Sequence, residues 1–170
     1  MKIRPIRRAL PYLAIQFGLV FLAGCASQER PKSNVLSRDQ VPAAIKQAFQ
    51  TKFPSAERPE WKIKSDQNYE AEFTLQGTEI AAKFDSTGKW LETESAIPPA
   101  KLPQAVRDVA GSQFHAYKVV ETQSVERWND ARQIYELHFE SAAQIVKAQF
   151  NADGTILNQS AKPRLNKAKE

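Results

Sequence analysis

The chain has 170 residues, with 24 Lys and Arg against 19 Asp and Glu, a formal net charge of +5 and a single cysteine. The basic excess lies at the two ends, since residues 35–160 carry 14 basic and 17 acidic side chains, which argues against a nucleic-acid-binding surface. One cysteine cannot form an intrachain disulfide, and two histidines without paired Cys/His spacing give no basis for a metal site.

The N-terminus has the three parts of an export signal. Residues 2–8 carry four basic side chains, residues 9–22 are almost entirely apolar, and small residues precede the cysteine. As a helix the apolar part reaches only ~21–24 Å against a hydrocarbon layer of ~30 Å, so a permanent span is the less favoured interpretation. Leu22-Ala23-Gly24-Cys25 resembles the lipobox of bacterial lipoproteins. That resemblance implies removal of a signal peptide at residues 1–24 and lipidation of Cys25, which anchors the protein to a membrane.

The residue after the cysteine bears on sorting. By the same resemblance, Ala26 in place of an aspartate implies the outer membrane, facing the periplasm, in a host with two membranes. The pair Arg7-Arg8 lacks the rest of a twin-arginine motif, so that export route is the weaker alternative.

Two polar segments flank the central region. Residues 25–34 contain the cysteine and no large apolar side chain, which predicts a flexible tether. Residues 161–170 carry four basic side chains against one acidic one and predict a basic disordered tail, either solvated or touching anionic headgroups or peptidoglycan. Residues 35–160 are long enough for one domain with its own core.

Two helices with the same apolar spacing are predicted 61 residues apart. Pro42 and Pro103 suit the first position of each helix, where the missing N–H costs nothing, and Pro54 ends the first helix. The apolar stripes are Val41, Ile45, Ala48, Phe49 and Phe53, then Leu102, Val106, Val109, Ala110 and Phe114.

Strand patterns follow each helix and recur at an offset of 66 residues. Residues 69–73 match 135–139, and residues 80–88 match 146–154. Gln76-Gly77 predicts a hairpin turn, and the glycines that end 85–88 and 151–154 predict four-residue turns. Period-two alternation predicts one face packed on the helix. Its core-facing members are Tyr69, Ala71, Phe73, Leu75, Ile80, Ala82, Phe84 and Leu91, then Tyr135, Leu137, Phe139, Val146, Ala148, Phe150 and Leu157, and Trp61 and Ile63 are assigned to a preceding strand.

These patterns predict an α+β domain built as a tandem duplicated unit, with unit one at residues 35–98 and unit two at 99–160. Each unit has one helix packed on a three- to four-stranded antiparallel sheet. The order Phe53-Pro54, Trp61, Tyr69-Glu-x-x-Phe73 and Phe84-Asp-x-x-Gly-x-Trp-Leu91 resembles the PepSY-like domain, which is also described as β-lactamase-inhibitor-like.

The resemblance covers roughly residues 41–157. It implies a β-lactamase inhibitory protein-like fold of two units, with joined or adjacent sheets whose open face meets a protein partner. It does not imply that a β-lactamase is the partner. Unit two departs from the pattern, because Trp128 is one position away from the match to Trp61 and Ile156 replaces Trp90.

Catalytic patterns are weak throughout. Glu70 and Glu72, like Glu92 and Glu94, share a strand face ~7 Å apart, which suits a carboxylate pair but is also ordinary solubilising alternation. Asn151-x-Asp153-Gly154 lacks the later glutamate of a calcium loop. We therefore expect no enzyme and no cofactor.

The open face is the predicted contact surface. If Leu91 points into the core, Trp90 lies on the open face, where an aromatic anchor among charges is typical of a protein contact; the alternative is that Trp90 packs on a loop or on unit two. His138, between Glu136 and Glu140, is either an ordinary surface histidine or a titrating contact with a raised pKa. The candidate partner-binding residues are Trp90, Lys83, Glu72, Glu92, Lys62, Lys64, His138, Ile145 and Lys147.

The sequence thus favours a monomeric, non-enzymatic envelope lipoprotein that binds, and in one version inhibits, a periplasmic protein through its open sheet face. The alternative is a small ligand or cell-wall component bound in a cleft between the two units.

Overall fold

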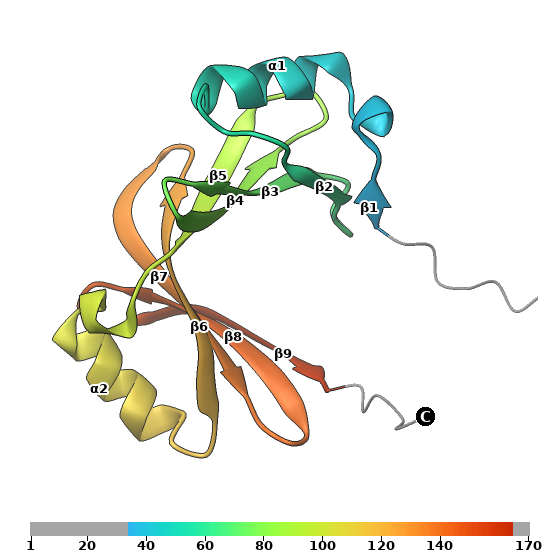
Figure 1. Ribbon diagram of the computed structural model, residues 1–170. Helices are drawn as coiled ribbons and strands as arrows, with labels where there is room; N and C mark the ends of the chain where they lie inside the picture. Colours follow the sequence, from blue (N-terminus) through green and yellow to red (C-terminus); the bar gives the residue numbers. More distant parts are fainter. Residues whose placement is uncertain (1–33, 165–170) are drawn as a thin grey trace, which may run out of the picture. The chain divides into compact units, whose positions relative to one another are not determined.

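The computed structural model describes residues 34–164, which form one continuous antiparallel sheet with two α-helices (Figure 1). The nine strands lie in the sheet in the order in which they occur in the sequence. The elements are β1 (Val35–Leu36), α1 (Ala43–Lys52), β2 (Glu60–Ile63), β3 (Tyr69–Leu75), β4 (Thr78–Phe84), β5 (Trp90–Ala96), α2 (Gln104–Gln113), β6 (Lys118–Arg127), β7 (Asp130–Glu140), β8 (Gln144–Asn151) and β9 (Ile156–Pro163). The predicted signal peptide and Cys25 lie outside the described residues.

The first core forms where α1 packs on β2–β4. Ile45 and Phe49 are the buried residues of the helix, and the Phe49 ring meets the rings of Trp61 and Phe73 at centroid distances of 5.4 and 5.1 Å. Edge-to-face rings at this separation add to the area that they bury. The predicted stripe is confirmed, although Pro42 is the N-cap and the helix begins one residue later than expected.

A second core forms where α2 packs on β7 and β8. Val106 and Ala110 are buried on the helix, and the ring of Phe114 stacks on Phe139 at 4.1 Å with an interplanar angle of 12°. Phe139 and Phe150 are fully buried. Two helices therefore cover two stretches of one sheet, each through the stripe predicted from the sequence.

Glycine turns bring the sheet close to the start of each helix. Gly88 and Gly154 have φ of +90° and +86°, in the turns predicted at residues 85–88 and 151–154. A Cβ at Gly154 would lie 2.9 Å from the carbonyl oxygen of Ala105 in α2. Glycine is therefore required both by backbone conformation and by close approach. The predicted Gln76-Gly77 hairpin is also confirmed, with positive φ at both residues.

Two β-bulges reverse part of the predicted face assignment. In the β4–β5 ladder Lys83 pairs with Glu92 and Phe84 with Trp90, so Leu91 is the extra residue. The ladder between β8 and β9 repeats this at Leu157, because Phe150 pairs with Ile156. A bulge shifts the period-two alternation by one. Trp90 and Ile156 therefore pack against the cores, and the prediction that Leu91 and Leu157 do so is wrong.

The strands β5 and β6 join the two stretches of sheet. Their register runs from Glu92 opposite Arg127 to Ala96 opposite Gln123. The predicted tail begins later than expected, since β9 continues to Pro163 by pairing with Gln144 of β8. At the other end, Asn34 accepts a hydrogen bond from the Ile63 backbone N–H at 2.8 Å, and β1 adds an edge strand that the sequence patterns did not indicate. Within residues 34–164, none of the helices has the length and apolar character of a membrane span.

Candidate binding face of the sheet

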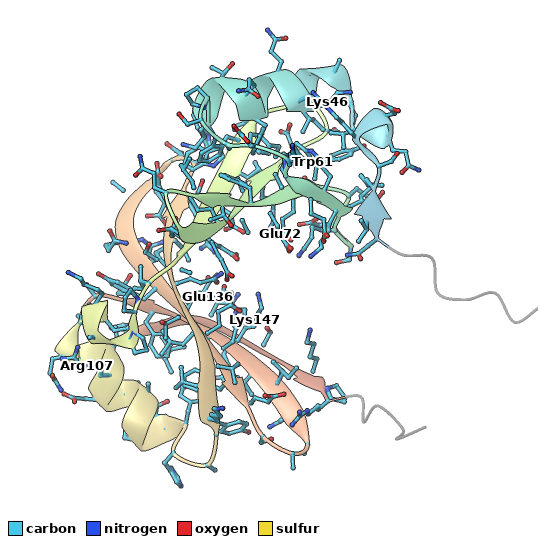
Figure 2. All side chains as sticks on the ribbon, in the orientation of Figure 1. Lys46, Trp61, Glu72, Arg107, Glu136 and Lys147 are labelled. Atoms are coloured by element: carbon cyan, nitrogen blue, oxygen red, sulfur yellow. The ribbon has the colours of Figure 1, made fainter. Side chains whose placement is uncertain are left out.

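The face of the sheet opposite the two helices carries a cavity of about 790 Å³, here called the sheet cavity. Strands β3 to β9 all contribute to its wall. Figure 2 shows Glu72 on β3 and Glu136 and Lys147 on β7 and β8 directed into the same space. Its lining includes seven glutamates against three lysines, one arginine and one histidine, so the cavity is polar with an acidic balance.

An ion-pair chain crosses the junction between β5 and β6. Glu92 accepts from Lys83 Nζ at 2.6 Å through one oxygen and from Arg127 Nε at 3.0 Å through the other. Arg127 also donates to Gln149 Oε1 at 2.9 Å. Burial disfavours the charged carboxylate, but these donors outweigh it and lower the pKa of Glu92. The chain of contacts fixes side chains of β4, β5, β6 and β8 against one another.

His138 forms the centre of a second cluster on β6–β8. Its Nδ1 lies 2.5 Å from Glu121 Oε2 and its Nε2 lies 2.7 Å from Glu136 Oε1. Burial of the imidazole opposes protonation, yet the two carboxylates prevail and raise the pKa of His138 to about 9. The ring is therefore an imidazolium at neutral pH.

Glu136 completes that cluster. It accepts from His138, from Lys147 Nζ at 3.0 Å and from Gln149 Nε2 at 2.7 Å. Burial opposes ionisation, but the three donors lower the pKa of Glu136 to about 2. The expected rise in the pKa of His138 is confirmed, but its second carboxylate is Glu121 and not Glu140, which pairs with Arg164 instead.

Glu94 differs from the other acids in the cavity wall. No hydrogen bond or ion pair to it occurs within residues 34–164, while burial and the neighbouring charge of Glu136 raise its pKa to about 7. The ionised form of this carboxyl is therefore disfavoured, unlike that of Glu92 or Glu136.

Most of the predicted contact residues share this face. Lys83, Glu92, Glu72, Lys64, His138 and Lys147 line the sheet cavity. Lys62 lies beside it and pairs with Glu72, and Lys64 pairs with Glu70 at 2.8 Å. Ile145 lies on the same face but outside the cavity, opposite Glu140 and Lys162.

Trp90 is the exception, since it lies on the helix-covered face. Its Nε1 donates to Thr93 Oγ1 at 2.9 Å, and Lys52 Nζ lies 3.5 Å from the centre of its ring system. The placement of Trp90 on the open face is therefore wrong, because the bulge at Leu91 turns it over. It packs against the first core and is no candidate for contact through the cavity.

Sequence patterns missed several members of the cavity wall. Arg127 and Gln149 reach the cluster only through the registers of β5–β6 and β7–β8. Glu121 enters it because a register shift between Val119 and Glu121 places it opposite His138. Alternation along a strand predicts which of its side chains lie on the polar face. It does not predict their cross-strand partners, because these depend on the register between two strands.

Two of the patterns considered above for chemistry are engaged in other contacts. Glu70 and Glu72, considered above as a carboxylate pair, are each bonded to a lysine. In the Asn151–Gly154 turn, Asp153 accepts from the Thr155 backbone N–H at 2.9 Å. Within the described residues, no group of three or more His, Cys, Asp or Glu side chains is arranged to hold a metal ion.

Comparison with known proteins gives the family. The family model described as "Putative beta-lactamase-inhibitor-like, PepSY-like" matches residues 27–79 and 67–158. A "BLIP-like protein" from Bacteroides fragilis is 23% identical over 76% of this chain and 92% of that one, with a TM-score of 0.58. A "DUF2874 family protein" from Bacteroides uniformis is 18% identical over 71% and 88%, with a TM-score of 0.61.

A third solved structure, described as "putative periplasmic proteins" from Bacteroides eggerthii, is 19% identical over 71% of this chain and 88% of that one, with a TM-score of 0.61. These likenesses show a shared fold. A search of curated proteins found no match. Because the family model spans most of the chain, the protein belongs to the PepSY-like, β-lactamase-inhibitor-like family.

Proposed function

We propose that this protein is a non-enzymatic binding module that holds a protein partner against the sheet cavity. The observation that carries the proposal is a set of charged side chains held by ion pairs on the sheet face opposite the helices. Side chains already fixed in place lose little conformational entropy on binding, which favours recognition. The family and the BLIP-like neighbour support a protein as the bound species.

The composition of the cavity wall favours a protein over a small molecule. Small-molecule sites are mostly apolar with a few polar groups, whereas this cavity is mainly charged. Its volume of about 790 Å³ nevertheless lies within the usual ~300–1,000 Å³ of ligand sites. A small ligand or cell-wall component bound between the two halves is therefore the second candidate.

The proposal extends to location and architecture. We take the protein to be an envelope lipoprotein, anchored to the outer membrane through Cys25 and facing the periplasm, as the lipobox resemblance implies and the periplasmic description of a structural neighbour supports. We take residues 35–98 and 99–160 to be a duplicated unit, since each helix is followed by four strands. In the more specific form of this proposal, the bound partner is a hydrolase and binding inhibits it.

The anchor has a direct test. Cells expressing the wild type are expected to incorporate labelled fatty acid into the protein, whereas Cys25→Ser is expected to lose the label. Label retained by the variant would contradict lipidation at Cys25.

Site-specific photo-crosslinking tests the binding face. A photoreactive residue is placed at Glu79 on β4 or at Ser160 on β9, both exposed and both in the cavity wall, and at Gln47 on α1 as the control. Irradiation of intact cells is expected to give the same protein adduct from both cavity positions and none from Gln47. An equal adduct from Gln47, or none from the cavity, would reject the proposal, and a small-molecule adduct from the cavity would favour the second candidate.

A further inference from the structure

The sheet cavity contains two acceptor groups that lack a donor within residues 34–164: the Glu94 carboxylate and the side-chain oxygen of Gln123. We propose that the bound partner inserts a cationic side chain, lysine or arginine, which pairs with Glu94 and donates to Gln123. This inference rests on the proposed function and specifies the chemistry of the partner.

Strand register explains why Glu94 has no partner. Its cross-strand neighbours are Ala81 on β4 and Val125 on β6, and neither side chain can donate a hydrogen bond. Two residues away on the same strand, Glu92 has Lys83 and Arg127 in the equivalent places. In the β4–β5 and β5–β6 ladders, Glu92 therefore has cationic cross-strand neighbours and Glu94 has apolar ones.

The nearby cations are already engaged. Lys83 is bonded to Glu92, Lys147 to Glu136, and Arg127 to both Glu92 and Gln149. Lys83 and Lys147 act on Glu94 only through their charge, against the opposing charge of Glu92 and Glu136. A further cation from outside is the group that would complete the site.

Gln123 is an independent sign of a missing donor. The residue is 7% exposed and lines the cavity. Its Nε2 donates to Glu121, but its Oε1 is buried without a partner within residues 34–164. Leaving a buried acceptor unpaired costs about 1–3 kcal/mol, so native proteins rarely do so without a reason. A donor brought by the partner would satisfy it.

The two acceptors are placed for one ligand. Gln123 pairs with Ala96, two residues beyond Glu94, so Glu94 and Gln123 are diagonal neighbours on one face, a spacing of about 7–8 Å. Ala81 and Ala96 both line the cavity, and their small side chains leave room beside the carboxylate. Arginine presents five donors in a planar fork and lysine three, so either can serve carboxylate and amide together.

A titration with amino-acid probes tests this inference. The purified protein is titrated with Nα-acetyl-arginine amide, Nα-acetyl-lysine amide and the neutral Nα-acetyl-citrulline amide, while NMR follows the side-chain resonances of Glu94 and Gln123. Saturable shifts in the millimolar range are expected with the two cations and not with citrulline. Glu94→Gln is expected to reduce the affinity about tenfold or more.

Glu57→Gln is the matched control, because it removes a carboxylate at an exposed position outside the cavity wall. It should leave probe affinity within about twofold of the wild type, since exposed charges contribute little. Equal binding of citrulline and arginine, or equal losses in the two variants, would overturn the inference. If the Glu94→Gln variant still gives the full photo-adduct at the sheet cavity, this inference is overturned and the proposed function stands. If cations bind at Glu94 but no photo-adduct forms at the cavity, the proposed function is contradicted and the cation site stands.

Discussion

The two faces of the sheet differ in the interactions that their side chains make. On the helix-covered face, aromatic and aliphatic side chains pack in two cores, as Phe49 does on Trp61 and Phe114 on Phe139. On the cavity face, charged side chains are held by one another, as Glu92 is by Lys83 and Arg127. Apolar packing on the helix-covered face therefore supplies most of the folding free energy, and the cavity face can carry a polar arrangement suited to binding.

The largest expected effect is on the helix-covered face. Phe49→Ala removes a buried ring in contact with Phe53, Trp61 and Phe73 and should lower the free energy of unfolding by roughly 3–5 kcal/mol. Chemical denaturation measures this. A decrease in the free energy of unfolding below about 1 kcal/mol is typical of a volume-conserving core substitution. It would contradict the assignment of stability to this face.

The glycine turns also contribute to stability on the helix-covered face. Gly154→Ala combines positive φ with a Cβ only 2.9 Å from the Ala105 carbonyl oxygen and should cost roughly 2–4 kcal/mol. Gly77→Ala is the matched control, since it has positive φ but nothing within 4 Å, and should cost roughly 1–2 kcal/mol. Thermal unfolding of the two variants compares them. Equal losses would mean that helix packing against the turn contributes nothing.

On the cavity face, one substitution should increase stability. The folded pKa of Glu94, about 7, lies above the unfolded value of 4.5, so the folded state becomes less favourable as pH rises from 4.5 to 7. Glu94→Gln should therefore stabilise the protein at pH 8 by at most about 3 kcal/mol and have no effect at pH 4. Urea denaturation of the variant and of the wild type at both pH values is the measurement. A destabilised variant at pH 8 would contradict an unpaired Glu94.

His138 should show a smaller effect with its own pH window. Its folded pKa of about 9 lies above the unfolded 6.5, so its contribution is complete below pH 6.5 and is lost as pH rises through 9. His138→Gln should cost roughly 1–2 kcal/mol at pH 6 and almost nothing at pH 10. A gap between variant and wild type that does not change with pH would show that His138 acts through packing alone.

The same contrast explains what the sequence could predict. The helix stripes, both cores and the glycine turns follow from local spacing, and they were predicted correctly apart from Leu91 and Leu157. The predictions for Leu91 and Leu157 are wrong because one extra residue in a strand moves the side chains beyond it to the opposite face. The sequences Trp90-Leu91 and Ile156-Leu157 carry no local pattern that indicates a bulge. The pairing of β5 with β6 could not be predicted, because it depends on contacts between distant segments.

For the cavity face, composition was predictable and connectivity was not. Lys83, Glu92 and His138 were expected on one face from alternation, and they are there. Period-two alternation predicts the same environment for Glu92 and Glu94. The cross-strand neighbours of Glu94 are Ala81 and Val125, however, so its carboxylate has no cation opposite it. That difference appears only when four strands are placed side by side.

The central claim is that the cavity face, and not the helix-covered face, meets the partner. The most direct measurement is the association rate of the photo-captured partner with two charge-reversed variants, Glu79→Lys in the cavity wall and Glu57→Lys outside it, both at exposed positions. Because charges near an interface steer association, Glu79→Lys should slow binding and alter its salt dependence, while Glu57→Lys should match the wild type. Equal rates for the two variants would contradict the claim.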